Sequence, residues 1–150
     1  MASSNSRNMV YVVSAAHPTG SSDLALRNQL TALVADNSRV TRLIHRTYLN
    51  TLGVDCWEVE SGLEAVELCE IGLIKFDLIL MEHDLPTLDG PQTTRLLRRM
   101  GVDSVIVGVT GRYLGMEIQE FIDAGLDEYL EKPLNRAKLI PLLRQIDDDK

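Results

Sequence analysis

The sequence predicts an α/β fold, in which a five-stranded parallel sheet carries helices on both of its faces. Five short runs rich in Val, Ile and Leu alternate with longer segments whose apolar residues recur every three or four positions. Right-handed connections between parallel strands place the helices on both faces, which gives a doubly wound, three-layer sandwich. We expect the strand order 2-1-3-4-5, with a crevice beside the first strand at the carboxyl edge of the sheet.

The expected strands are short and apolar, as is typical of strands buried on both faces. In chain order they occupy residues 30–35, 54–59, 77–81, 105–109 and 128–130. The first helix follows Ser38, and the second opens with the capping box Ser61-x-x-Glu64. One face of the first helix shares four side chains: Val40, Leu43, Ile44 and Thr47.

The three later helices also have clear boundaries. The third begins near Asp89-Gly-Pro91 and ends before Gly101, and the fourth ends before Gly125. We expect one stripe of the third helix to face the sheet: Thr93, Leu96, Leu97 and Met100. The fifth helix follows Asn135, and Pro141 inside it predicts a kink or a late helix start.

Length and composition indicate one soluble globular domain. The 150 residues are 45% apolar and 25% charged, and the net charge of -7 argues against direct nucleic-acid binding. No apolar run approaches the roughly 20 residues that span a membrane, so we expect no membrane partner. The only two cysteines, Cys56 and Cys69, are expected to be free thiols in a reducing compartment, the cytoplasm or the nucleus.

Residues 1–28 are rich in Ser and Asn and predict a flexible tail ahead of a single domain at residues 29–147. Residues 9–16 weakly imitate a secretory signal. Their apolar core is short and the chain lacks a disulfide pattern, so secretion is not favoured.

Polar residues follow four of the expected strands at their carboxyl ends, where parallel sheets gather their chemistry. Asp36 and Asn37 follow the first strand, Glu82 the third, Thr110 the fourth and Lys132 the fifth. The expected strand order brings all five into one crevice.

The order and spacing of these five residues resemble the receiver domain of two-component response regulators. The resemblance runs from about residue 30 to about residue 146 and implies a flavodoxin-like, CheY-like fold. The phrases Gly-Val-Thr-Gly, Ala-Gly-Leu-Asp-Glu and Glu-Lys-Pro-Leu look most like plant single-domain receivers of type C.

Two residues depart from the family pattern. The family has its phospho-acceptor aspartate at the position of Glu82, and an Asp-Asp pair where this chain has Asp36-Asn37. In a working receiver, as the resemblance implies, these acids hold Mg²⁺ and the acceptor attacks a phosphohistidine. We therefore expect the Mg²⁺ site formed by Asp36, Asn37 and Glu82 to be weak or empty, because Asn37 contributes no charge. We also expect normal phosphate acceptance to fail.

Glu82 carries one methylene more than aspartate, which moves its carboxylate by roughly 1 to 1.5 Å further into the space that the metal and the phosphoryl group would occupy. The longer carboxylate can instead reach toward Lys132, where it occupies part of the position of an acyl phosphate. Two interpretations stay open: Glu82 mimics the phosphorylated state, or the site is simply inactive. Thr110 and Tyr129 match the switch pair of the family, in which the aromatic ring follows the hydroxyl inward. The resemblance also suggests a cis peptide bond between Lys132 and Pro133.

Three further ionisable residues are expected to have ordinary roles. Asp84 is interpreted as a solvated loop acid rather than a substitute acceptor. His83 is expected to be packed or solvated, and His45 to belong to an exposed helix face.

In receivers, the first helix and the loop after the last strand dock the histidine phosphotransfer protein. The resemblance carries this surface onto five apolar residues and two rim arginines: Val40, Leu43, Ile44, Pro133, Leu134, Arg39 and Arg42. Periodicity alone leaves open which of the apolar side chains faces outward.

The resemblance implies a stand-alone receiver or pseudo-receiver in a His-to-Asp phosphorelay such as plant cytokinin signalling, with no leading role in catalysis. Its expected partners are a histidine phosphotransfer protein, a sensor histidine kinase or other response regulators. The alternative is a phosphoryl sink that hydrolyses phosphohistidine-derived phosphate with Mg²⁺ and Glu82 or Asp84. A flavin or nucleotide binder is disfavoured because Asp36-Asn-Ser-Arg39 replaces a glycine-rich phosphate loop.

Overall fold

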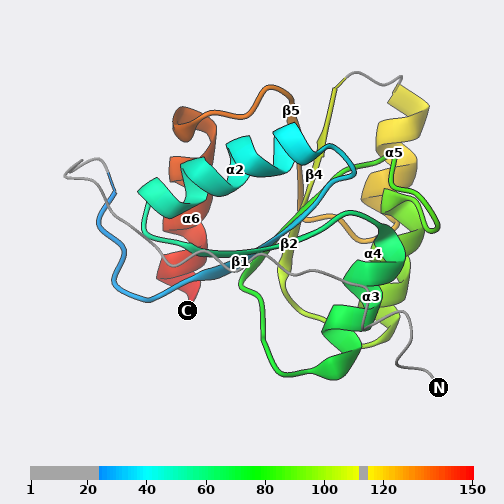
Figure 1. Cartoon of the computed structure of the whole chain (residues 1–150), viewed down its shortest axis with the longest axis horizontal. Coiled ribbons are helices and arrows are strands. Elements are labelled where there is room, and N and C mark those ends of the chain that lie inside the picture. Colours follow the sequence, from blue (N-terminus) through cyan, green and yellow to red (C-terminus); the bar gives the residue numbers. More distant parts are fainter. Residues whose placement is uncertain (1–23, 112–114) are drawn as a thin grey trace.

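The computed structural model describes residues 24–111 and 115–150 and confirms the predicted α/β sandwich (Figure 1). All strand pairings are parallel, and the strand order is β2-β1-β3-β4-β5, as predicted. The strands are β1 (Thr31–Ala35), β2 (Asp55–Val59), β3 (Leu78–Met81), β4 (Val105–Thr110) and β5 (Glu128–Glu131).

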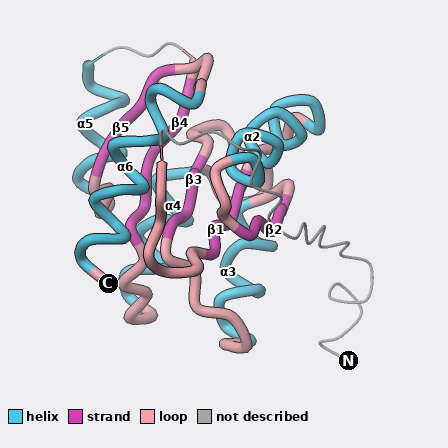
Figure 2. Tube along the Cα trace, turned by 90° about the vertical axis from the view of Figure 1, so that its left-hand side faces the viewer, coloured by secondary structure: helices cyan, strands magenta, loops and turns pink. Residues whose placement is uncertain are grey.

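The helices form one layer on each side of the sheet (Figures 1 and 2). Their bounds are α2 (Arg39–Thr51), α3 (Gly62–Ile71), α4 (Gly90–Arg99), α5 (Gly115–Asp123) and α6 (Arg136–Asp149). Helices α2 and α6 pack on one face, where Leu49 and Leu143 belong to one apolar cluster with strand side chains such as Val34. Helices α3, α4 and α5 pack on the other, where Leu97 and Phe121 belong to the second cluster.

The helix starts lie where their capping residues predict them. The Ser38 hydroxyl accepts a hydrogen bond from the Thr41 N–H at 3.2 Å, and the Asn135 side chain accepts one from the Lys138 N–H. Asp89 and Gln92 form a full capping box at the start of α4. These caps fix the points at which the chain leaves the carboxyl edge of the sheet and turns back.

One helix prediction is wrong, and one of the two alternatives predicted for the last helix, a late start, is excluded. Met100 does not face the sheet, because the stripe drifts around α4 and leaves Met100 41% exposed at the end of the helix while Thr93 and Leu97 are fully buried. Helix α6 does not start late but continues from Arg136 through Pro141. Its apolar face packs on the sheet and outweighs the hydrogen bond that Pro141 cannot donate.

The free cysteines are confirmed, with Cys56 buried and Cys69 half-buried.

Contacts of the amino-terminal segment begin before the predicted domain boundary at residue 29. The backbone N–H groups of Arg27 and Asn28 donate to the Asp147 carboxylate at 2.8 and 2.9 Å, which lowers the pKa of that carboxyl group. Most of the predicted tail, residues 1–23, lies outside the described residues. Within residues 24–111 and 115–150, no helix combines the length and apolar character needed to cross a membrane.

Candidate functional site

Asp36, Glu82, Thr110 and Lys132 lie together at the carboxyl edge of the sheet, as the sequence predicts. Asp36 directly follows β1, Glu82 follows β3, Thr110 ends β4 and Lys132 follows β5. The loop after β3 is held close to α4: a Cβ on Gly90 would lie 2.4 Å from the Glu82 carbonyl oxygen, and the Gly90 N–H donates to the His83 carbonyl. Only glycine fits this approach, which fixes the backbone that presents Glu82.

Lys132 bridges the two acids. Its ammonium donates to Asp36 Oδ2 at 2.9 Å and to Glu82 Oε1 at 2.5 Å. Both acids are buried, with Asp36 2% and Glu82 7% exposed. Buried carboxylates need such partners, so the three side chains form one compact charged unit.

The second oxygen of each acid is also engaged. Glu82 Oε2 accepts hydrogen bonds from the N–H groups of His83 and Asp84 at 2.6 and 3.1 Å. Asp36 Oδ1 accepts one from the Ser38 N–H at 2.8 Å. Glu82 therefore has each carboxylate oxygen bound by a donor, and its orientation is set by its own loop and by Lys132.

Neighbouring charges and burial have opposite effects on the pKa of Lys132. Burial alone lowers the pKa of its ammonium, but the hydrogen bonds and the negative charges of Glu82 and Asp36 outweigh that effect and raise the pKa. Lys132 is therefore charged at neutral pH. The site holds two acids and one ammonium group, a formal sum of about -1.

These residues fit a divalent cation poorly. The predicted ligand set was Asp36, Asn37 and Glu82, but Asn37 is exposed and neutral, and Lys132 already binds both remaining carboxylates. Among residues 24–111 and 115–150, no group of three His, Cys, Asp or Glu side chains is placed to hold a metal ion. Mg²⁺ prefers several hard oxygen ligands in tight octahedral geometry, which this arrangement does not offer.

The predicted switch residues lie on neighbouring strands. Thr110 is 1% exposed, and its hydroxyl finds no hydrogen-bond partner among the described residues. Tyr129 is half-buried on β5, and its register partner on β4 is Gly108, which has no side chain to crowd the ring. Burial, followed by the charges of Glu131 and Glu82, raises the pKa of Tyr129. The peptide bond between Lys132 and Pro133 is cis, as the family suggests.

The structure supports the interpretations of His83 and Asp84. The His83 ring packs edge-on against Phe121, with ring centroids 5.4 Å apart. Asp84 is 70% exposed in its side chain and contacts the His83 ring at 2.9 Å. The Asp84 carboxylate therefore points into solvent rather than into the crevice.

The predicted docking surface is exposed on α2. Val40, Leu43 and Ile44 are 66%, 50% and 43% exposed. An open cavity of about 310 Å³ lies beside them, between α2 and the loop after β5. Pro133 is exposed at its rim, and Leu134 also lines the cavity although it is only 3% exposed. Most of the Leu134 side chain packs with the apolar side of α6.

The prediction that His45 is exposed is also wrong. His45 is only 3% exposed, because it shares with Leu49 the side of α2 that faces the core. Burial is the main cause that lowers its pKa from 6.5 to about 4, with Lys132 acting in the same direction and Asp36 opposing. His45 is therefore neutral at physiological pH.

Arg42 is not free at the rim of the docking surface. Its Nε donates to Glu58 Oε1 at 3.1 Å and its Nη1 to the Asp36 carbonyl at 2.7 Å, while Arg46 holds Glu58 Oε2 at 2.7 Å. Glu58 is 6% exposed. Sequence analysis missed this network. Its signal was a glutamate inside an otherwise buried strand, with two arginines one turn apart on the neighbouring helix. Arg39, by contrast, is exposed as predicted.

Comparison with known proteins identifies a matching family. The response regulator receiver domain matches residues 32–144. "Two-component response regulator 24" of Arabidopsis thaliana is 45% identical over 79% of this chain and 85% of its own length. The receiver domain of sensor histidine kinase PA1611 from Pseudomonas aeruginosa, solved with magnesium in its active-site cleft, is 29% identical. It covers 81% of this chain and 99% of its own, with a TM-score of 0.72.

A third similarity is one of fold alone. The receiver domain of Saccharomyces cerevisiae Ssk1, solved with the histidine phosphotransfer protein Ypd1, is 20% identical to this chain. It covers 80% of this chain and 90% of its own, with a TM-score of 0.72.

Proposed function

This chain belongs to the response regulator receiver family, and from that premise we propose that it is a pseudo-receiver: a stand-alone receiver that acts through protein contacts without normal phosphate acceptance. It would serve a plant His-to-Asp phosphorelay such as cytokinin signalling, in the cytoplasm or the nucleus. The match to 85% of the length of the Arabidopsis relative supports a stand-alone receiver. The Glu82–Lys132–Asp36 unit is the observation that carries the proposal.

Phosphate acceptance fails on two counts in this proposal. One oxygen of Glu82 binds Lys132 and the other binds two backbone N–H groups, so neither is free to attack a phosphohistidine. In-line transfer tolerates such misplacement poorly. Magnesium, which would neutralise the incoming phosphoryl group, would bind weakly because Asn37 supplies no charge and Lys132 occupies both acids.

Glu82 mimics only part of a phosphorylated acceptor. Its carboxylate binds Lys132, which is one of the contacts that the family resemblance implies for an acyl phosphate. The Thr110 hydroxyl remains without a partner among the described residues. A carboxylate has fewer oxygens than a phosphoryl group, so it cannot serve Lys132 and Thr110 together. We propose that Lys132 is held as in the active state while the Thr110–Tyr129 switch is not triggered.

The docking surface remains suited to a phosphotransfer protein. Val40, Leu43 and Ile44 present exposed apolar area, with Arg39 at the edge. An apolar centre with a charged rim is typical of a protein interface. The proposed partner is a histidine phosphotransfer protein, the class of protein that binds the similarly folded Ssk1 receiver, with sensor kinases and other response regulators as further candidates.

The proposal is tested by phosphotransfer from a radiolabelled histidine phosphotransfer protein in the presence of Mg²⁺. Three chains are compared: the unmodified chain, Glu82→Asp, and Glu82→Asp combined with Asn37→Asp. We expect label on the double variant and none on the unmodified chain. Label on the unmodified chain would show another acceptor, and loss of label from the donor without transfer would favour the phosphoryl-sink function.

Partner binding is measured separately from chemistry. Ile44→Glu places a charge at the centre of the docking surface and should weaken binding of the phosphotransfer protein by about tenfold or more, since central apolar contacts dominate interfaces. Ile122→Glu, on α5, is the control, because Ile122 is similarly exposed at 41%. Equal binding by both variants would place the interface elsewhere.

A further inference from the structure

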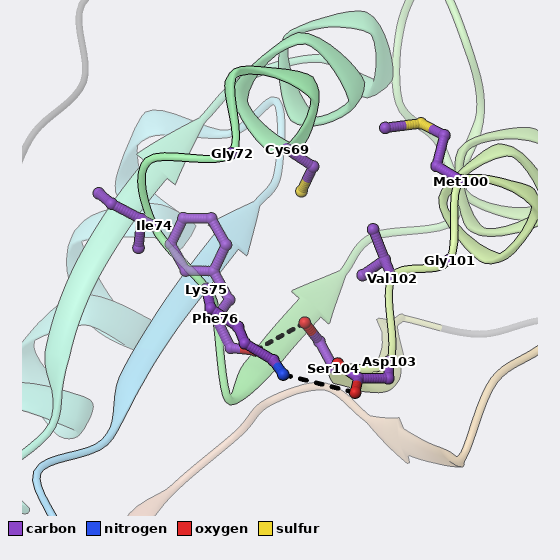
Figure 3. A pocket seen from close by; sticks show the side chains of 10 residues that line it. All are labelled: Cys69, Gly72, Ile74, Lys75, Phe76, Met100, Gly101, Val102, Asp103 and Ser104. Atoms are coloured by element: carbon purple, nitrogen blue, oxygen red, sulfur yellow. Dashed lines mark hydrogen bonds and ion pairs between the residues drawn. The ribbon is translucent and has the colours of Figure 1, made fainter.

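A separate cavity of about 280 Å³ lies where the chain enters β3 and β4, at the end of these strands opposite to the one that Glu82 follows. It is bounded by the carboxyl ends of α3 and α4 and by the loops that lead into β3 and β4. Figure 3 shows the side chains that line it, among them Cys69, Lys75, Phe76, Met100, Val102 and Asp103. None of these residues belongs to the acidic site or to the docking surface.

The wall of this cavity is mixed: Cys69, Ile74, Phe76, Met100 and Val102 form its apolar part, beside the polar side chains of Lys75, Asp103 and Ser104. Phe76 is 2% exposed, and burial raises the pKa of the Cys69 thiol to about 11, so Cys69 stays uncharged at neutral pH. Met100 contributes a thioether, which makes favourable contacts with aromatic rings. A cavity of about 150 Å³ admits a benzene ring, so this larger one admits a ring with a short side chain.

Two exposed apolar residues lie next in the chain to the lining residue Gly72. Ile71 and Leu73, on either side of the lining residue Gly72, are 49% and 86% exposed. Exposed apolar patches beside a hollow are typical of binding sites. The body of the ligand is therefore apolar.

The polar part of the cavity favours a cation. Asp103 and Lys75 form an ion pair at 3.5 Å, with side chains 74% and 80% exposed, so an ammonium group already reaches this carboxylate. Such an exposed pair is weak and readily exchanged. Helix α3 ends at the cavity without a basic residue in its last turn, which leaves the negative end of its dipole uncompensated. At the end of α4, by contrast, the Arg98 guanidinium is bound to the Val102 and Ser104 carbonyls.

We propose that this cavity binds a small arylalkyl amine. The protonated amine displaces the Lys75 ammonium from Asp103, and the ring lies against Phe76, Cys69 and Met100. The net charge of the chain, -7, adds a general attraction for cations. This inference does not depend on the phosphorelay, because the cavity shares no residue with the acidic site.

The head group is tested with three ligands of similar body and different charge: phenethylamine, phenethyl alcohol and hydrocinnamate. Each is titrated into the isotope-labelled full chain, and amide shifts of Gly72, Gly101 and Val102 are followed by NMR. We expect phenethylamine to bind about fivefold more tightly than the other two, since an exposed ion pair is worth up to about 1 kcal/mol. Equal binding by all three ligands, tightest binding by the acid, or no shift at these amides would overturn the proposal.

Removing the charge of Asp103 and removing the charge of Lys75 should change the affinity for phenethylamine in opposite directions. Asp103→Asn should weaken phenethylamine binding about fivefold, and Lys75→Met should strengthen it about twofold, because the competing ammonium is gone. Asp123→Asn, an exposed acid on α5, is the matched control and should leave binding unchanged. Weaker binding to Lys75→Met, or unchanged binding to Asp103→Asn, would contradict the assignment.

Two further arms test the apolar body of the ligand. Val102→Phe fills the cavity and should abolish the shifts, with the fold checked by circular dichroism. N-acetyl-lysine methylamide carries the same ammonium group on an aliphatic stem and should bind more weakly than phenethylamine. If it binds as tightly, the cavity recognises the lysine of a protein rather than a small aromatic amine, and the proposal fails.

Discussion

Lys132 Nζ donates to Glu82 Oε1 at 2.5 Å, so the residue that we propose to stand at the acceptor position of the family is bound to an ammonium group. The same ammonium group binds Asp36 at 2.9 Å. Lys132 therefore balances two buried carboxylates, and the stability of the carboxyl edge depends on it.

Replacing Lys132 by methionine should destabilise the fold by about 2 kcal/mol at neutral pH, because two neighbouring carboxylates lose their counter-charge. This value lies below that of a fully buried pair, since the Lys132 side chain is 23% exposed. Urea unfolding measures the change. Lys75→Met, at the exposed pair with Asp103, is the control and should cost little.

The stability of the Lys132→Met variant should depend on pH in a defined direction. Without Lys132, two buried carboxylates repel each other, and protonation of one of them relieves both the repulsion and the cost of burial, so the variant should recover stability as pH falls. In the unmodified chain the Lys132 pKa is raised, so its contribution is present at neutral pH and is lost only as pH rises through that raised pKa. A Lys132→Met variant equally unstable at pH 7 and pH 5 would contradict this account.

His45 should make the fold acid-sensitive. Its pKa falls from 6.5 to about 4 on folding, so the unfolded chain binds a proton that the folded chain does not. Stability should therefore drop by about 3 kcal/mol as pH falls from 7 to 4. The slope of unfolding free energy against pH should flatten in His45→Gln and persist in His83→Gln. An unchanged slope in His45→Gln would assign the acid sensitivity to other groups.

Glu58 should be the most costly acid to remove on β2. Glu58→Gln weakens the charge partner of two partly buried guanidinium groups, those of Arg42 and Arg46, and should cost about 3 kcal/mol. Glu60→Gln is the matched control, because Glu60 is 67% exposed and lies 3.7 Å from Arg42. Thermal and urea unfolding of the Glu58→Gln and Glu60→Gln variants measure the two costs. Equal losses of stability would mean that the burial of Glu58 does not strengthen its ion pairs.

Replacing Thr87 should make the fold more stable. Its φ of 73° places a β-branched residue in the left-handed region, where such residues are strained. Thr87→Asn should stabilise the fold by about 1 kcal/mol, because asparagine tolerates this conformation. Thr47→Asn, on the exposed side of α2, controls for the change of side chain. A loss of stability in Thr87→Asn would show that the Thr87 side chain makes a contact worth more than its strain.

The sequence by itself predicted the sheet, its strand order and the meeting of Asp36, Glu82, Thr110 and Lys132. The elements and the doubly wound sheet follow from local periodicity, capping residues and the handedness of crossovers, which act over a few residues at a time, whereas the strand order and the grouping of the site residues are what the resemblance to the receiver family implies. Only the tertiary structure decided that Lys132 spans both acids while Thr110 stays without a described partner. It also decided that His45 faces the core and that Arg42 binds Glu58. These outcomes depend on how each helix is rotated about its axis and on contacts between residues more than ten positions apart in the chain. Periodicity does not encode either, because an amphipathic stripe fixes the buried face of a helix only to within the width of a side chain.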